Sequence, residues 1–481
     1  MTVFLHSSRM PAPVEDLAAW HFRDGALDRL LPPWQKVRVV GTFGGVAEGS
    51  IAELELSIGG IPIRWRAVHE DVDPERGFRD RQVQGPFASW VHDHRFMPEP
   101  EGHSLLEDRI EYAIRFGPVG RLLAGAKVRA DLDRTFAFRH DRLRHDLRRH
   151  VEDRTLAGPD AAPLQIALTG SSGMVGRPLR AFLATGGHHV RRVVRGRPDR
   201  AAGDVSWDPV RGEIDGRGLE AMDAVVHLAG ENIAAGRWTP ARMASIRSSR
   251  VEGTRLLCEA LAKLERPPRV LVSASAVGVY GDRPDLDAEG DPATALDESG
   301  PQGAGFLAET AAAWEAATRP AEEAGIRVVH LRIGVVVSAT GGIVAKLRPP
   351  FSLGLGGPVG HGRQAMPWIA LDDLIAAILW SIRREDLSGP INAVAPQPRS
   401  NRTFGRDLAR AMRRPFLAPL PAFIVKAAFG RMGRELLLGG APVAPRRLSE
   451  SGFRFDFPTL DRALAFEFGR PHPESPTDPD A

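Results

Sequence analysis

The chain is 481 residues long, which is more than one hydrophobic core normally serves, so we expect two or three domains. Its composition, with 43% hydrophobic and 26% charged residues, is that of a soluble globular protein. The formal net charge is only +3, so nucleic acid is not an expected partner. The basic run at residues 142–150 (RLRHDLRRH) is interpreted as a solvated helix end, where cations favour the negative end of the helix dipole.

Cysteine content and the N-terminal sequence bear on the location of the protein. Cys258 is the only cysteine, so no disulfide can form within the chain and nothing indicates an oxidising compartment. The first residues, MTVFLHSSRMPAP, lack a basic stretch followed by a long apolar one, and no apolar run approaches the roughly 18 residues that span a bilayer. We therefore expect a cytoplasmic protein with no membrane partner.

The first part of the chain, residues 1–152, is typical of an α+β domain. Short β-rich runs separated by clusters of Gly, Pro, Asp and Glu predict an antiparallel sheet. These runs lie at residues 37–41, 51–58, 63–68, 87–96 and 105–116. Helical spacing of apolar residues precedes them at 13–31 and follows them at 119–147, where one long helix is expected to pack across the sheet.

The stretches SRMPAPVEDLAAWH and GPFASWVHDHRF, in this order of elements, resemble the helix-grip domains of the polyketide-cyclase and START-like (SRPBCC) superfamily. The resemblance implies a cavity between helix and sheet for an apolar or amphipathic ligand. His92 and His94 stand two apart in a predicted strand and so project from one face, but no third ligand has a recognisable spacing. We therefore expect imidazoles that line the cavity or the surface, and no metal site.

A stretch rich in Pro, Gly and Ala within residues 153–163 predicts a linker. Beyond it, apolar runs alternate with helical patterns. This alternation predicts a doubly wound parallel sheet with helices on both faces, an α/β Rossmann fold. The apolar runs lie at residues 165–169, 190–194, 224–228, 270–275 and 328–333.

The strongest motif is LTGSSGMVG, in which Gly170, Gly173 and Gly176 follow a buried strand and open a helix. The first glycine allows a tight turn, the second lets backbone approach a pyrophosphate, and the third lets helix and strand pack closely. The phosphates would then lie at a positive helix N-terminus. The motif therefore predicts a dinucleotide site. Its residues around this turn are Thr169, Gly170, Gly173, Met174, Val175 and Gly176.

The TGxxGxxG spacing is similar to that of the extended short-chain dehydrogenase/reductase family, and DAVVHLAGENI, SASAVGVYG and LRIGVV resemble its later strands in the same order. The segments GENI (230–233), PWIxxD (367–372) and PRRLxxxGF (445–453) resemble an epimerase-family branch, NAD-dependent epimerase/dehydratase with a small DUF1731-like C-terminal domain. The resemblance covers residues 164–467. It implies a Rossmann domain at 164–400 and a small C-terminal substrate lobe at 401–470. The tail at 471–481 is expected to be disordered.

The end of the second Rossmann strand bears on the form of the cofactor. An Asp or Glu there would bind the ribose 2′-hydroxyl, whereas VVRGRPDR places Arg195 and Arg197 beside a 2′-phosphate. NADP(H) is therefore predicted over NAD; the alternative is that these are surface arginines of an arginine-rich chain. Further cofactor contacts, from the strand ends and from the resemblance, are Leu228, Ala229, Gly230, Glu231, Arg237, Ser273 and Arg332.

The family's usual proton-transfer pair, Tyr-x-x-x-Lys, is missing from this chain. Phe306 and Thr310 stand where the tyrosine and lysine would fall, and a phenyl ring cannot exchange a proton. Ser275 matches the family's substrate-polarising serine; the alternative is a strand-end serine that satisfies local backbone. Tyr280 is a second candidate proton donor; the alternative is a wall of the nicotinamide pocket. Ser275 and Tyr280 are the predicted catalytic residues.

Glu309 and Glu315, on the helix after the fifth strand, are expected to be solvent-facing carboxylates. Candidate substrate contacts in the loop at 353–373 are His361, Arg363 and Trp368. The leading hypothesis is an NADP(H)-dependent oxidoreductase or epimerase-like enzyme for a small-molecule substrate, attached to a domain that binds an apolar ligand. The alternatives are a non-catalytic NADP(H)-binding sensor and a ligand carrier regulated by the cofactor.

Overall fold

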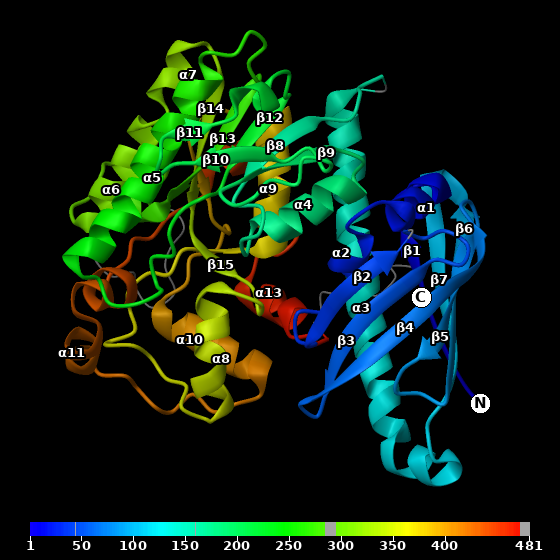
Figure 1. Ribbon diagram of the computed structural model, residues 1–481. Helices are drawn as coiled ribbons and strands as arrows, with labels where there is room; N and C mark the ends of the chain where they lie inside the picture. Colours follow the sequence, from blue (N-terminus) through cyan, green and yellow to red (C-terminus); the bar gives the residue numbers. More distant parts are fainter. Residues whose placement is uncertain (44, 159, 284–294, 472–481) are drawn as a thin grey trace. The chain divides into compact units, whose positions relative to one another are not determined.

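The computed structural model describes residues 1–43, 45–158, 160–283 and 295–471 (Figure 1). By its internal contacts the chain forms two compact units, which are described separately. The first comprises Met1–Pro159, Ala181–Gly187 and Phe466–Ala481, and the second comprises Asp160–Arg180 and His188–Ala465. Residues 472–481 of the tail that was expected to be disordered lie outside the described residues.

The first unit contains a seven-stranded antiparallel sheet in the order β1-β7-β6-β5-β4-β3-β2. Its strands are β1 (Thr2–Met10), β2 (Val37–Phe43), β3 (Ile51–Ile58), β4 (Ile61–Asp73), β5 (Gly77–Gln84), β6 (Ser89–Glu99) and β7 (His103–Ala113). Sequence patterning predicted five strands and missed β1 and β5. The sequence of β5, GFRDRQVQ, is charged and only its first two residues are buried, so it lacks the apolar alternation that identifies a strand.

The helices of the first unit are α1 (Val14–Phe22), α2 (Ala26–Leu30) and α3 (Gly117–Ala157). The single helix expected at 13–31 is divided in two, because Gly25 adopts a left-handed φ of 92°. The long helix extends to Ala157, into the segment expected as a linker. An apolar cluster that includes Phe4, Trp90 and Phe136 joins α3 to the sheet, as in a helix-grip domain.

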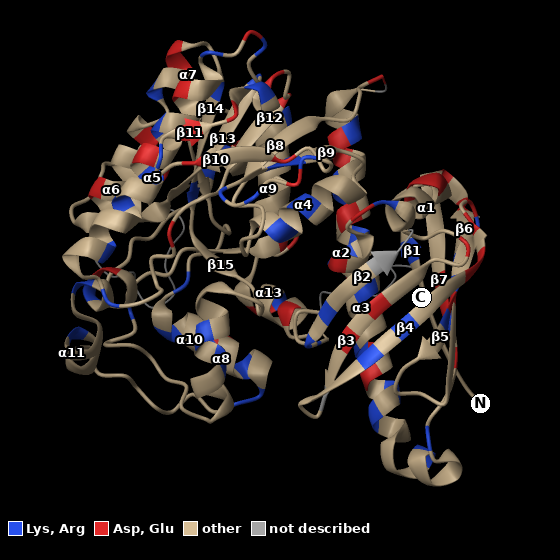
Figure 2. Ribbon diagram, in the orientation of Figure 1, with Lys and Arg blue, Asp and Glu red and all other residues tan. Residues whose placement is uncertain are grey.

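The sequence suggested that the basic run at 142–150 is a solvated helix end, and this interpretation is wrong. The run lies inside α3, and Arg142 and Arg149 are buried. The Arg142 guanidinium lies 4.9 Å from the centre of the Phe138 ring, where a cation interacts favourably with the aromatic face. Elsewhere on α3 the charges alternate in sign (Figure 2), as in the Lys127–Asp131 pair at 2.7 Å.

The second unit is built on an eight-stranded sheet in the order β11-β10-β9-β8-β12-β13-β14-β17. Its strands are β8 (Gln165–Thr169), β9 (His189–Val194), β10 (Val205–Asp208), β11 (Glu213–Ile214), β12 (Ala224–His227), β13 (Val270–Ala276), β14 (Arg327–Ile333) and β17 (Gly389–Ala393). All neighbours are parallel except β10 and β11. This is a Rossmann fold, and the chain order reverses between β8 and β12.

Helices cover both faces of this sheet: Figure 1 shows α5 (Pro240–Leu261) and α6 (Phe306–Ala316) on one side and α9 (Leu371–Arg383) on the other. The remaining helices of the fold are α4 (Gly176–Thr185), α7 (Arg319–Glu323), α8 (Gly342–Ser352), α10 (Asn401–Met412), α11 (Ala422–Gly433), α12 (Arg446–Glu450) and α13 (Leu460–Glu467). A separate two-stranded sheet pairs β15 (Val335–Val337) with β16 (Trp368–Ala370). Among the described residues, no helix combines the length and apolarity that a bilayer crossing requires.

Candidate functional site

The candidate site begins where the neighbouring strands β8 and β12 end, at the reversal of strand order. Thr169 is fully buried, and its Oγ1 accepts hydrogen bonds from the backbone N–H groups of Leu228 (3.1 Å) and Ala229 (3.2 Å). The same oxygen lies 2.8 Å from Nδ1 of His227. Thr169 thus fixes the two strand ends against each other, at the crevice where ligands bind in such sheets.

The glycine turn has the close approaches that its motif predicts. Gly170 has a φ of 68°, and a β-carbon there would lie 2.9 Å from the carbonyl carbon of Leu228. A β-carbon on Gly176 would lie 2.2 Å from the carbonyl oxygen of Gly170, which no real contact allows. A β-carbon on Gly173 would lie 3.1 Å from the carbonyl oxygen of Gly170. The turn therefore needs glycine at its first and third positions, and the start of α4 at Gly176 lies directly behind it.

Met174, inside the turn, packs on the loop that precedes α8. A β-carbon on Gly341 would lie 2.6 Å from its Sδ atom, and one on Gly342 would lie 3.2 Å from it. Val175 accepts the hydrogen bond of the Leu179 N–H and so begins the helical ladder. The assignment of both residues to the cofactor stays a prediction.

Arg195 and Arg197 follow β9 and are exposed, and neither forms an ion pair within the described residues. Their neighbour Arg192 differs, because its guanidinium is paired with both carboxylate oxygens of Asp204 at 2.8 and 2.6 Å. The structure therefore leaves two cations available at the end of β9. These are the positions at which the sequence predicts a 2′-phosphate.

The GENI segment is held by arginines of α5. The Glu231 carboxylate accepts a hydrogen bond from Arg242 at 2.7 Å, and its backbone oxygen accepts one from Arg250 at 3.0 Å. Burial lowers the pKa of Arg250 to about 10. Gly230 lies against that guanidinium, 3.3 Å from the place of a β-carbon, and Arg237 donates to the Ala427 carbonyl at 3.0 Å. The polar groups of Glu231 and Arg237 thus have protein partners, and their cofactor roles stay predictions.

Ser275 ends β13 in contact with a carboxylate that sequence reasoning placed in solvent. Its hydroxyl donates to Oε1 of Glu315 at 2.7 Å. Arg332 at the end of β14 grips the same carboxylate at both oxygens, each at 2.9 Å. The expectation that Glu315 faces solvent is therefore wrong, since its side chain is only 14% exposed. Glu309, one and a half turns earlier on α6, is exposed as expected.

Most of the hydrogen-bond donors of Arg332 have partners inside the protein. Besides Glu315, its Nη1 donates to the Tyr280 hydroxyl at 2.9 Å and to the Glu298 carbonyl at 3.2 Å, so four of its five N–H donors are engaged. Arg332 thus orients the Glu315 carboxylate and the Tyr280 hydroxyl, and the cofactor contact expected from the sequence stays a prediction. Burial alone would raise the pKa of the Glu315 carboxyl, but the hydrogen bonds from Arg332 and Ser275 hold it below its usual value.

Tyr280 is completely buried, and its hydroxyl donates to Oδ1 of Asn392 at 2.8 Å while accepting from Arg332. Burial raises its pKa. A phenol enclosed in this way orients Arg332 and Asn392, and a role for Tyr280 as a proton donor stays a prediction. Ser273, which the sequence also predicts to contact the cofactor, is buried in β13. Its hydroxyl lies 3.4 Å from the carbonyl oxygen of the next residue, Ala274.

The residues that replace the missing proton-transfer pair are buried at the start of α6. Phe306 packs edge-on against Trp238, with ring centres 5.1 Å apart. The Thr310 hydroxyl is buried and has no hydrogen-bond partner among the described residues. Neither side chain supplies an acid or base. Ser275 is itself only 3% exposed and donates to Glu315, and its catalytic role stays a prediction.

The loop candidates separate into exposed and buried residues. His361 and Arg363 are exposed, and the Arg363 N–H donates to Nδ1 of His361 at 3.0 Å. Trp368 is fully buried in β16, where its indole N–H donates to the Gln397 carbonyl at 3.0 Å. Trp368 is thus part of the protein core, and a role for the other two in substrate binding stays a prediction.

Two buried networks were not found by sequence reasoning. His227 lies between Thr169 and Thr254, 2.9 Å from the hydroxyl of Thr254, and burial lowers its pKa to about 4. Glu298 accepts the Asn392 N–H at 3.0 Å and the Arg447 N–H at 3.3 Å, which attaches the PRRL segment to β17. Both networks join residues far apart in sequence, so no local motif indicates them.

Three family models match successive parts of the chain. The model of the NAD dependent epimerase/dehydratase family matches residues 166–394, that of a domain of unknown function (DUF1731) matches 420–467, and that of polyketide cyclase / dehydrase and lipid transport matches 10–138. An epimerase family protein of Mycobacterium tuberculosis is 42% identical over 306 residues, which cover 64% of this chain and 98% of that protein. The chain belongs to the NAD-dependent epimerase/dehydratase family.

Two solved structures of this epimerase family extend the comparison. One, described as a nucleoside-diphosphate sugar epimerase from Corynebacterium glutamicum, is 32% identical with a TM-score of 0.78 and covers 97% of this chain and 90% of its own. The other, human epimerase family protein SDR39U1 with NADPH, is 34% identical with a TM-score of 0.56 and covers 62% of this chain and 97% of its own. The first of these likenesses includes the N-terminal domain as well as the Rossmann unit.

Proposed function

We propose that the second unit is an NADP(H)-dependent oxidoreductase or epimerase-like enzyme that acts on a small molecule. The observation that carries the proposal is the glycine turn at the reversal of strand order, whose first and third glycines pack directly against the protein's own backbone as the dinucleotide-binding motif requires. Backbone N–H groups at the start of α4 would hold the pyrophosphate. Arg195 and Arg197 would hold a 2′-phosphate.

The relatives support this choice of cofactor and suggest a substrate class. The human relative was solved with NADPH, and it matches the unit that contains this turn. The relative from Corynebacterium glutamicum is described as a nucleoside-diphosphate sugar epimerase. We therefore propose nucleoside-diphosphate sugars as the first substrate class to test.

Ser275 is the group that we propose to act on the substrate. The bound nicotinamide would supply or accept a hydride. In the present geometry the Ser275 proton is directed to Glu315, so its oxygen can accept a hydrogen bond from a substrate hydroxyl. If its own proton turns from Glu315 to a substrate carbonyl, the same group donates. Arg332 keeps Glu315 ionised and so keeps Ser275 oriented.

A sensor without turnover is the second candidate function, because Phe306 and Thr310 occupy the positions of the proton-transfer pair. Neither can replace the tyrosine and lysine that exchange protons in the wider family. For the first unit we propose an apolar or amphipathic ligand, on the likeness to the lipid transport model. A carrier whose ligand binding responds to the cofactor is the corresponding alternative.

Arg195→Glu is expected to weaken NADPH binding by about tenfold or more, because it replaces a phosphate-pairing cation by a repelling carboxylate. NADH, which lacks the 2′-phosphate, should lose much less. Equilibrium titration of both cofactors measures this difference. Arg217→Glu, the same change of charge in the exposed turn after β11, is the matched control and should leave both affinities unchanged. Equal losses for the two cofactors at Arg195→Glu would contradict the assignment.

Ser275→Ala is expected to lower kcat on the order of 100-fold, since one positioned hydrogen-bonding group at the reacting oxygen is lost. NADPH affinity should stay within a few fold, because the hydroxyl acts on the substrate in the transition state and not on the cofactor. Steady-state kinetics together with a cofactor titration make the comparison.

Tyr280→Phe separates positioning from proton donation. The change leaves Arg332 and Asn392 each short of one buried hydrogen bond, so we expect a loss of roughly 1–3 kcal/mol in unfolding free energy. Turnover by the folded variant should change little. If Tyr280→Phe abolished turnover while Ser275→Ala were silent, the two roles would be reversed.

A further inference from the structure

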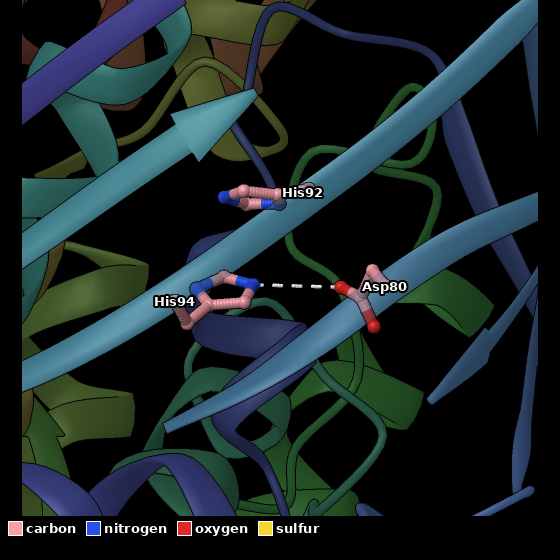
Figure 3. Close-up of side chains that lie close together, drawn as sticks. All are labelled: Asp80, His92 and His94. Carbon is pink, nitrogen blue, oxygen red and sulfur yellow. Dashed lines mark hydrogen bonds and ion pairs between the residues drawn. The ribbon is translucent and has the colours of Figure 1, made fainter. Parts of the chain in front are cut away.

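We infer that the first unit contains a binding site for a divalent transition-metal ion, formed by Asp80, His92 and His94. One ligand atom from each of the three lies within 4.8 Å of those of the other two. Figure 3 shows the His94 ring directed at Asp80, with His92 beside it on the same strand. The site is separate from the proposed cofactor site, and it does not depend on the function proposed for the second unit.

The sheet register places these three residues together. Strands β5 and β6 are antiparallel, and Asp80 pairs directly with His92 while Phe78 pairs with His94. Residues opposite each other in such a pair point to the same face, and so do residues two apart in one strand. Both histidines are buried, and Asp80 is the third ligand that the spacing within β6 could not reveal.

Another carboxylate lies close to the remaining nitrogens of the two histidines. Oδ1 of Asp108, on β7, lies 2.8 Å from His92 Nε2 and 2.8 Å from His94 Nδ1. Its Oδ2 lies 2.6 Å from Nε2 of His140 on α3. Histidines that bind metals usually give their other nitrogen to a carboxylate or carbonyl, as His92 does here to Asp108, which orients the ring and raises its basicity. The arrangement leaves His94 Nε2 facing Oδ2 of Asp80, at 3.4 Å.

Asp80 is supported from its far side in the same way. Its Oδ1 lies 3.2 Å from Nε2 of His69, whose Nδ1 is 3.0 Å from the Ser50 hydroxyl. The close pairs His69–Asp80 at Oδ1 and His94–Asp108 at Nδ1 do not have the angles of hydrogen bonds. The nitrogen and oxygen atoms of this cluster therefore lie closer to one another than the hydrogen bonds among them explain.

Charge balance also favours a cation. Asp80 and Asp108 place two carboxylates in this interior, with side chains 24% and 4% exposed. Within the described part of the chain, all the ion-pair partners of these two carboxylates are histidines. The Arg139 guanidinium interacts with both carboxylates and offsets part of the cost of burying them, and one dication with neutral imidazoles would neutralise both.

The ligand atoms select the class of metal. Two imidazole nitrogens and one carboxylate oxygen suit Zn²⁺ or Fe²⁺, whereas Mg²⁺ and Ca²⁺ prefer oxygen ligands alone. Three protein ligands leave a coordination position for water or a bound molecule, which is typical of reactive sites and not of closed structural ones. The aromatic ring of Phe78, stacked on His94 at 4.2 Å, contributes an apolar wall.

The test uses the full-length, tag-free protein after chelator treatment and gel filtration. Zn²⁺, Mg²⁺ and, without oxygen, Fe²⁺ are added separately, and retained metal is measured by elemental analysis. We expect about one Zn²⁺ or Fe²⁺ per chain and no stoichiometric Mg²⁺. Calorimetric titration gives the affinities, and Co²⁺ provides a visible spectrum that reports the ligands.

Three variants and one control assign the ligands. Asp80→Asn and His94→Gln should each weaken binding by more than about 100-fold, and Asp108→Asn by about 10- to 100-fold, because Asp108 acts through the histidines. The control His103→Gln changes a histidine at the start of β7, outside the cluster, and should bind as the wild type does. If one variant fails to fold by circular dichroism, the other two still decide the question.

The inference is overturned if no transition metal is retained by the folded wild-type protein. It is equally overturned if Asp80→Asn and His94→Gln bind metal as tightly as His103→Gln, since the metal would then lie elsewhere. An unchanged Co²⁺ spectrum in both ligand variants would lead to the same conclusion. In any of these cases the cluster is a hydrogen-bonded polar core.

Discussion

Gly176→Ala is expected to abolish NADPH binding at concentrations that saturate the wild type, with affinity reduced on the order of 100-fold or more. The added β-carbon would lie 2.2 Å from the carbonyl oxygen of Gly170 and 2.9 Å from the α-carbon of Ser171. Both of these contacts are backbone atoms, which cannot rotate aside as a side chain can, so the start of α4 must move away from the turn. The N–H groups that would hold the pyrophosphate move with it. Calorimetric titration with NADPH measures the loss.

Gly216→Ala is the matched control for this prediction. Gly216 lies in the turn after β11, its φ is not in the left-handed region, and an added β-carbon would meet only Cδ2 of Leu264, at an ordinary contact distance of 3.8 Å. The same chemical change should therefore leave NADPH affinity within a few fold of the wild type. Normal binding by a folded Gly176→Ala variant would show that the cofactor does not use this turn.

Glu315→Gln is expected to lower the free energy of unfolding by about 3 kcal/mol or more, because it leaves the buried Arg332 cation without its partner. The two side chains are only 14% and 11% exposed, so solvent screens their pair weakly. Chemical denaturation measures the change. Glu309→Gln on the same helix, at an exposed position, is the control and should alter stability by less than about 0.5 kcal/mol. Equal effects of the two variants would contradict the ion-pair account.

The same variant predicts a pH dependence. The pKa of Glu315 is lower in the folded protein than its usual value of 4.5, so the carboxylate contributes stability above pH 4.5. That contribution is lost as the pH falls through the lower folded value. The stability difference between wild type and Glu315→Gln should therefore be constant near neutral pH and shrink below pH 4.5. A difference that grew in acid would have the wrong sign.

The architecture was largely predictable because its signals are local. Apolar runs, the glycine turn and the family motifs indicated the parallel sheet, and five of its eight strands were located. The strands β10, β11 and β17 were missed because they have two to five residues and little apolar pattern. In the first unit, β5 was missed for its charged sequence, and with it Asp80, the third residue of the proposed metal site.

The candidate site was predictable where a motif fixes the backbone, and not where side chains meet across the fold. Gly170 and Gly176 have the close approaches that their spacing implies. Glu315 on α6 gave no sign of burial in the sequence, because its partner Arg332 lies 17 residues away on the strand β14. The contacts of Arg332 with Tyr280 and Glu298 likewise join segments far apart in the chain, so no sequence motif indicates them.

Hydride transfer by the wild-type protein is the most direct test of the proposed enzyme. NADPH carrying deuterium at nicotinamide C4 is incubated with the full-length protein and a panel of carbonyl compounds and keto-sugar nucleotides, which can accept a hydride. In a second reaction NADP⁺ is incubated with nucleoside-diphosphate sugars, whose hydroxyl-bearing carbons can donate one, and the products of both reactions are analysed by chromatography and mass spectrometry. We expect a deuterated alcohol, or an oxidised or epimerised sugar nucleotide, from at least one compound, formed at a rate that falls on the order of 100-fold in Ser275→Ala. Tight binding of the cofactor with no turnover in either reaction would contradict the proposed enzyme and would support the sensor.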